Sequence, residues 1–169
     1  MAGKSYKYVV TISSLDDAIS IAWSGIEELR EELQEIVDNS AVPDSPRIQT
    51  LESTLDLFNA LVEIEMPEPY AAALPPDFPS LPASITYSLA APRAKKGSTS
   101  RAVRAENYGA MLTAAAGALH DYLDACEVIS SEDMHEALRT YLEDVKEVAN
   151  DLDGQSGILS ECEFPAMFG

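Results

Sequence analysis

The feature that most constrains the fold is an apolar heptad pattern within residues 14–39. Its apolar residues are spaced alternately by four and three positions for about three heptads. They are Leu15, Ile19, Ala22, Ile26, Leu29, Leu33 and Ile36. Ser14 stands where a helix N-cap belongs, and Asp17 follows three residues later, as in a capping box. The pattern predicts one long helix that buries a single face against other helices.

The same spacing returns after a break at residues 38–46 that contains two prolines. The second apolar run is Ile48, Leu51, Leu55, Phe58 and Val62. It stops before Pro67 and Pro69, which exclude a helix. Two helices with matching apolar faces and a short break between them predict an antiparallel hairpin over residues 14–66.

Two more helical patterns predict a second hairpin over residues 105–154. The third helix is expected to begin near Ser98 or Ser100, and its apolar face is Tyr108, Met111, Ala115, Leu119, Tyr122, Cys126 and Ile129. Residues 130–133 read as the cap of a fourth helix. The apolar face of that helix is Met134, Leu138, Tyr141, Val145, Val148 and Leu152. Gly154 is the expected stop, in the C′ position.

The remaining segments have different compositions. The β-branched and aromatic residues 7–12 predict a short strand in an N-terminal arm (1–13), and residues 84–89 predict a second strand beside it. Seven of the ten prolines lie in residues 67–92, which favours extended chain that wraps the surface as part of a crossover over 67–104. The apolar tail, 155–169, is expected to dock.

Together these patterns predict an all-α, single-domain protein. Four amphipathic helices form two antiparallel hairpins, in an arrangement like a four-helix bundle, and the Pro-rich crossover joins them.

The charge balance is strongly acidic. Eleven Lys and Arg residues stand against 29 Asp and Glu residues, which gives a net charge of −18 and a pI near 4.2. Such a field repels phosphate backbones and anionic lipids and attracts basic partners or cations. Two distant cysteines and no apolar leader or membrane span favour a reduced, soluble, cytoplasmic protein.

Carboxylates on the polar faces of the first and fourth helices are the candidate partner-binding residues. They form long negative stripes that can replace rows of phosphates in binding a basic protein surface. The set is Glu27, Glu28, Glu31, Glu32, Glu35, Glu136, Glu143, Asp144 and Glu147. Residues 93–104 form a basic island, which we interpret first as a linker that neutralises neighbouring helices. The alternative is a docking arm for an acidic surface, including another copy of this chain.

Glu27, Glu28 and Glu31 match the EExxE element of the all-α nucleoside triphosphate pyrophosphohydrolases, in which carboxylates hold Mg²⁺. That family combines this element with a later ExxD. Here the nearest pair on the second helix, Glu52 and Asp56, is one residue too long. With the apolar face turned inward, the three glutamates point outward, whereas metal ligands must converge.

Other candidate sites are incomplete in the sequence. Glu132 and His135 resemble the ExxH element of di-iron bundles, but the second such pair is missing. A calcium loop aligned on Gly154 lacks both anchoring carboxylates, so that stretch is interpreted as a helix end and turn. His120 could pair with Asp124, while Cys126 lies about 120° away from His120 around the helix. No metal, cofactor or catalytic residue is therefore predicted.

Residues 13–19 and 27–39, with the closing residues 163–169, resemble small acidic helical proteins of tailed bacteriophages. The resemblance implies an accessory or virion protein of unassigned activity and transfers no functional residue. The leading hypothesis is a non-catalytic protein that binds a basic protein partner, in the phage case a host nucleic-acid-binding or defence protein. The alternatives are a self-associating assembly component and the Mg²⁺-dependent pyrophosphohydrolase.

Overall fold

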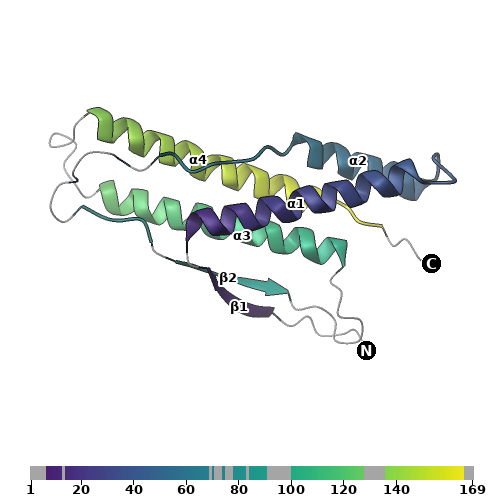
Figure 1. Cartoon of the computed structure of the whole chain (residues 1–169), viewed down its shortest axis with the longest axis horizontal. Coiled ribbons are helices and arrows are strands. Elements are labelled where there is room, and N and C mark those ends of the chain that lie inside the picture. The colour runs from purple at the N-terminus through teal and green to yellow at the C-terminus, as the bar shows by residue number, and fades with distance from the viewer. Residues whose placement is uncertain are drawn as a thin grey trace.

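The computed structural model describes residues 7–12, 14–68, 70, 74, 78–82, 84–90, 100–127 and 136–165, with the side chains of 7–12 and 87–90 excepted. The elements follow in the order β1 (Lys7–Ile12), α1 (Leu15–Asp38), α2 (Pro46–Ala60), β2 (Ile85–Ala90), α3 (Arg101–Glu127) and α4 (Glu136–Glu161). Figure 1 shows two antiparallel helical hairpins, α1 with α2 and α3 with α4, packed together. The predicted helical architecture is confirmed.

Helix α3 is central to the packing. It contacts α4, α1 and strand β2, whereas α2 contacts α1 and, more lightly, α4. The two hairpins are staggered along their length. Tyr108 lies on Gly25, and Arg104 reaches Glu32, so α1 covers the first half of α3. In Figure 1 the C-terminal end of α3 and the N-terminal end of α4 extend beyond α1.

Helix α1 begins as its sequence predicts. The Asp17 backbone N–H donates to the Ser14 hydroxyl at 3.1 Å, which satisfies one of the free amides of the first turn. The predicted apolar residues are buried, apart from a half-buried Ile36. Trp23 packs at the edge of the core, where the Arg30 guanidinium lies 6.0 Å from its ring centre.

Helix α2 is shorter than predicted. Ser45 caps it and Pro46 occupies its first turn, where a missing N–H costs little. The helix ends at Ala60, so Val62 lies beyond it and is 62% exposed, while Leu61 is buried. The assignment of Val62 to the apolar face was wrong, because the backbone turns extended at Leu61 and rotates the next side chain outward.

Helix α4 is longer than predicted. It continues through Gly154 and Gly157 to Glu161, so the helix stop assigned to Gly154 was wrong. The calcium-like stretch is helix interior rather than a turn. Gln155 and Leu159 are buried on the packed face, and this burial outweighs the weak helix preference of two exposed glycines. Ile129 and residues 130–135, which include the predicted cap and Met134, lie outside the described residues.

Strands β1 and β2 pair in antiparallel register from Lys7 opposite Ala90 to Ile12 opposite Ile85. The pairing predicted between the two segments is confirmed. The ribbon lies against α3 through β2. Ser100 caps α3 by accepting from the Val103 N–H, as one of its two predicted starts required.

The described residues between α2 and β2 lie along the helices (Figure 1). Ile64, Met66, Phe78 and Leu81 pack on the core, and the Tyr70 ring lies 6.0 Å from that of Tyr141. The described residues of the crossover therefore follow the surface, as its composition predicted. None of the described helices is both long and apolar enough to cross a lipid bilayer.

The tail after α4 docks on α2 through Glu163 and Phe164. The Thr54 hydroxyl donates to the Glu163 carbonyl at 2.6 Å and accepts from the Glu163 N–H at 3.2 Å. Phe164 meets Phe58 edge to face, with ring centres 6.3 Å apart. The expected docking of the tail is confirmed for these residues.

Candidate functional site

The outer face of α1 carries a stripe of carboxylates. Glu28, Glu31 and Glu35 recur at helical spacing opposite the buried face, and all three are exposed. Among the described residues no Lys or Arg lies within salt-bridge distance of them. We call these three residues the α1 stripe. Within the described part of the chain, the α1 stripe is a row of negative charges in contact with solvent and without a neighbouring cationic side chain.

Glu27 is exposed beside the stripe but lies 3.8 Å from Arg30, one turn along the same helix. Arg30 is the only basic residue of α1, and it also lies over the Trp23 ring. Because Glu27 is exposed and Arg30 is only half-buried, this ion pair contributes little to stability. The carboxylate of Glu27 is therefore partly neutralised by Arg30, unlike those of the α1 stripe.

Glu32 does not belong to the exposed acidic face to which it was assigned. Its side chain is half-buried and turned toward α3, where Arg104 approaches to 2.6 Å and Arg101 to 3.8 Å. The hydrogen bond to Glu32 raises the pKa of Arg104, which stays charged. The cause is helical geometry, since Glu32 lies at the boundary with α3 whereas Glu31 lies opposite the core. The end of the basic island thus neutralises a neighbouring helix, as its first interpretation proposed.

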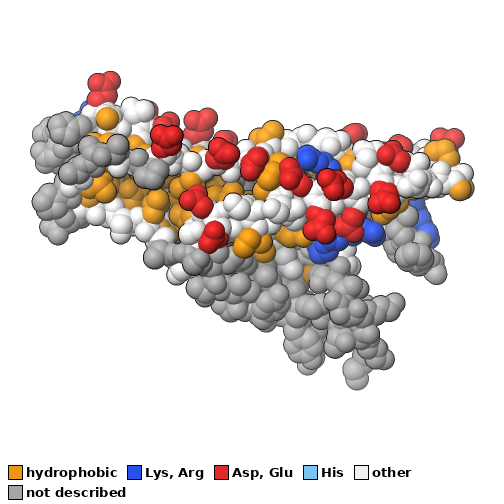
Figure 2. All heavy atoms as spheres, viewed as in Figure 1, with side chains coloured by type: hydrophobic (Ala, Val, Ile, Leu, Met, Phe, Trp, Pro, Cys, Tyr) orange, Lys and Arg blue, Asp and Glu red, His pale blue; other side chains and the backbone are white. Residues whose placement is uncertain are grey.

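The acidic residues predicted on α4 are all exposed: Glu136, Glu143, Asp144 and Glu147. Figure 2 shows Asp and Glu side chains along most of the face it displays, over α1, α2 and α4. The negative surface therefore extends over both hairpins and includes residues outside the predicted partner-binding set, such as Glu52 and Asp56 of α2.

The carboxylates do not converge on a metal site. Glu27, Glu28 and Glu31 point outward from α1, as their spacing implied. Across the ranges that the structure describes, no group of three or more His, Cys, Asp or Glu residues could hold a metal ion. Glu132 and His135, the residues of the di-iron element, lie outside those ranges.

His120 pairs across the hairpin rather than along its own helix. Its Nε2 lies 2.8 Å from Oδ2 of Asp153 on α4, so the pairing considered with Asp124 is replaced. Further along α3, Cys126 is buried beside Tyr122, and burial raises the pKa of its thiol. A buried thiol held neutral is a poor nucleophile. The described residues thus provide no Cys–His pair at this position.

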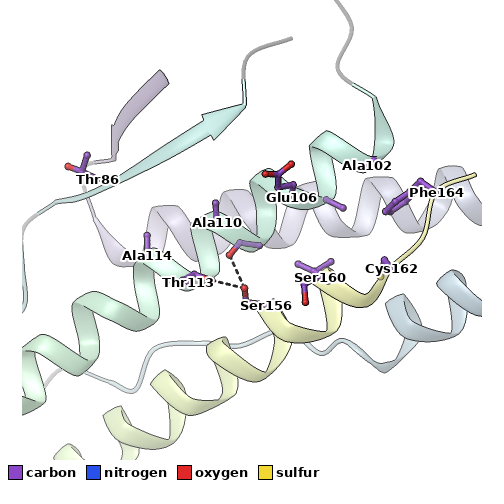
Figure 3. A pocket seen from close by; sticks show the side chains of 13 residues that line it. Thr86, Ala102, Glu106, Ala110, Thr113, Ala114, Ser156, Ser160, Cys162 and Phe164 are labelled. Carbon is purple, nitrogen blue, oxygen red and sulfur yellow. Dashed lines mark hydrogen bonds between the residues drawn. The ribbon is translucent and has the colours of Figure 1, made fainter. Parts of the chain in front are cut away.

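A groove of about 750 Å³ runs along α3, between β2 and the end of α4. Figure 3 shows that small side chains of α3 line it, with Ser156 and Ser160 of α4 and Phe164 of the tail along its wall. Within it, Thr113 and Ser156 share a hydrogen bond of 2.6 Å, and Ser156 also donates to the Gly109 carbonyl at 3.1 Å. These hydroxyl groups therefore already have partners inside the protein.

Several polar contacts between helices were missed in the sequence. Besides His120–Asp153 and Thr113–Ser156, Gln155 donates through its side-chain amide to the Val62 carbonyl at 2.7 Å. Each joins residues more than 30 positions apart. None of the polar side chains in these contacts lies on an apolar face that the sequence predicted, so the local pattern gave no signal for the contacts.

We compared the chain with protein-family models, curated proteins and solved structures, and none of them matches. The surface described above therefore has to be interpreted from its own chemistry.

Proposed function

We propose that this chain is a non-catalytic binding protein whose α1 stripe and α4 carboxylates bind a basic protein surface. The observation that carries the proposal is the row of exposed Glu28, Glu31 and Glu35, without a cation partner in the described residues, beside a Glu32 that has two. Successive turns of α1 present these charges about 5.4 Å apart. That periodicity suits a surface of Lys and Arg side chains.

Electrostatic complementarity of this kind gives fast association that weakens as salt is added. A narrower form of the proposal is charge mimicry, in which the carboxylate rows compete with a phosphate backbone for a nucleic-acid-binding protein. If the chain is encoded by a phage, that protein belongs to the host. The phage resemblance contributes only to this narrower form.

The test is a displacement assay with a defined probe, a small basic DNA-binding protein bound to a short fluorescent duplex. We expect the wild-type chain to release the duplex at about 50 mM salt and to lose this ability at about 200 mM. The triple substitution Glu28→Gln/Glu31→Gln/Glu35→Gln should weaken displacement by roughly threefold to a hundredfold, at about 0.2–1 kcal/mol for each exposed pair.

A matched control removes three other exposed acids: Glu52→Gln, Asp56→Asn and Glu63→Gln. It changes net charge equally but leaves the α1 stripe intact, so it should displace the duplex like the wild type. Equal loss in both triples would mean that only total charge matters and would refute a site on α1. Absence of displacement by the wild type would refute the charge-mimicry form, and a direct titration of the probe protein then decides the broader proposal.

A further inference from the structure

The groove between β2, α3 and the end of α4 has no part in the proposed function. Its volume of about 750 Å³ lies in the range that is typical of small-molecule sites. Because the α3 side chains along its floor are short, the space that longer ones would fill stays open (Figure 3). These floor residues are Ala102, Ala105, Gly109, Ala110 and Ala114.

One wall of the groove is held in place by the docked tail. Leu159, Cys162 and Phe164 contribute its apolar surface. Phe164 packs on Phe58, and the residue before it is bound to Thr54 by two hydrogen bonds. The wall is therefore formed before any ligand arrives, which lowers the entropic cost of binding.

The hydroxyl groups that α3 and α4 contribute to the groove have no proton left for a ligand. Ser156 donates to the Gly109 carbonyl at 3.1 Å, so Thr113 supplies the proton in its 2.6 Å contact with Ser156. Ser160 donates to the Gly157 carbonyl at 2.6 Å. Carboxylate and phosphate groups are bound through donors. These hydroxyls therefore do not favour an anionic ligand.

Among the described residues that line the groove, Glu106 alone carries a charge. It is exposed, and no described Lys, Arg or His lies within ion-pair distance of its carboxylate. Hydrogen bonds from a cation to a carboxylate are stronger than those between neutral groups. The net charge of −18 also attracts cations to the molecule. A ligand of this groove should therefore carry a positive charge.

We propose that the groove binds a linear aliphatic ammonium ion, which is an unbranched alkyl chain with one charged amine at its end. The ammonium group donates to the Glu106 carboxylate, and the chain lies along the short side chains of α3 toward Ala114. These two residues are about 12 Å apart along the helix axis, which suits an extended chain. The site lies outside the α1 stripe and the α4 carboxylates, so it does not depend on the proposed function.

Charge disfavours the other occupants of such a groove. A second copy of this chain brings its own net charge of −18 toward Glu106, and nucleic acid brings phosphates. A fatty acid would fit the apolar floor equally well. Its carboxylate, however, would meet Glu106 with no hydroxyl proton to offset the repulsion.

The test is isothermal titration calorimetry of the full chain with decylammonium chloride, below the concentration at which this amphiphile forms micelles. At about 0.15 M NaCl the Debye length is about 8 Å, so diffuse attraction to the acidic surface is largely screened. We expect saturable binding of one equivalent. Decanoate has a similar chain and the opposite charge, and propylammonium has the charge without the long chain. Neither should bind saturably at the same concentrations.

Two pairs of variants locate the site. Ala110→Leu puts a larger side chain on the floor and should weaken binding about tenfold or more, whereas Ala137→Leu, at an exposed position of α4 outside the groove, should bind like the wild type. Glu106→Gln should weaken binding about twofold to fivefold, as for the loss of an exposed ion pair. Glu52→Gln on α2 removes the same charge elsewhere and should have no effect. Circular dichroism verifies that each variant is folded.

A wild type that does not bind decylammonium saturably would overturn the proposal. So would binding that Ala110→Leu leaves unchanged, since the amphiphile would then lie elsewhere on the acidic surface. Equal binding of decanoate, or equal effects of Glu106→Gln and Glu52→Gln, would refute recognition of the charge by Glu106. A wild-type dimer in sedimentation that Ala110→Leu dissociates would assign the groove to a second copy instead. The displacement assay uses other residues, so either proposal can fail while the other stands.

Discussion

At the scale of single residues, glycines of this chain have opposite roles. Gly25 is buried where α1 meets α3, and the Tyr108 ring occupies the space that a Cβ would need. Gly154 lies in an exposed part of α4, with nothing within 4 Å of a Cβ built there. The first glycine permits close packing of two helices, while the second only weakens the helix that contains it.

Gly25→Ala should lower the free energy of unfolding by about 1–3 kcal/mol, because the Tyr108 ring would have to move within a packed interface. Gly154→Ala should raise it by about 0.5–1 kcal/mol through better helix propensity. Urea denaturation followed by circular dichroism measures both. Stabilisation by Gly25→Ala would show that α1 and α3 are further apart than described.

The two thiols should make the fold sensitive to alkaline pH. Burial raises the pKa of Cys162 to about 11 and also raises that of Cys126. An unfolded thiol titrates near a pKa of about 8.5, so the folded state holds the proton more tightly. The contribution to stability is complete below about pH 8.5 and is lost as the pH rises toward about 11.

Urea midpoints measured across this range should therefore fall with pH, and Cys162→Ala should make the decline shallower. Burial also raises the pKa of Tyr122, so some decline should persist in that variant. A decline that Cys162→Ala leaves unchanged would show that this thiol is as accessible to water in the folded chain as in the unfolded one.

At the scale of elements, the tail is the segment that joins the ends of the two hairpins. Its contact with α2 combines the two hydrogen bonds between Thr54 and Glu163 with the Phe58–Phe164 ring pair. Thr54 is 2% exposed, so its hydroxyl has no water to replace these bonds. The docking is thus specific rather than a general apolar contact.

Thr54→Val should cost about 1–3 kcal/mol of stability, because it leaves the backbone polar groups of Glu163 without their partner. Phe164→Ala should cost a similar amount through lost ring packing. Glu163→Ala is the control, since the tail binds through the backbone of Glu163 rather than through its side chain. Thermal unfolding measures all three, and a control as destabilised as Thr54→Val would contradict this contact.

At the scale of the whole molecule, the carboxylates repel one another. A net charge of −18 opposes compaction, and the α1 stripe has no cation partner in the described chain to offset it. The acidity therefore lowers the stability of the fold.

Added salt should consequently stabilise the monomer. We expect Tm to rise between about 10 mM and about 1 M NaCl as the Debye length shrinks from about 30 Å to about 3 Å. Potassium chloride at the same ionic strength is the control, because screening does not depend on the cation. A Tm that falls with either salt would mean that favourable ion pairs, such as Arg104–Glu32, outweigh the repulsion.

The sequence by itself determined the four helices, most of their buried faces and the two hairpins. These features depend on local spacing, caps and prolines, which act within a few residues, as Ser14, Ser45 and Ser100 show. The outward direction of Glu28, Glu31 and Glu35 followed from the same helical period.

Two kinds of feature were decided only by the tertiary structure. One is a local conformational preference that packing overrules, and the other is a contact with a residue far away in the sequence. Burial of Gln155 and Leu159 carries α4 through Gly154, and the position of α3 turns Glu32 into an ion-pair partner of Arg104. The packing of α4 against α3 likewise brings Asp153 within hydrogen-bond distance of His120. Local sequence records how strongly a residue prefers a conformation, but the free energy of packing depends on neighbours that are far away in the chain.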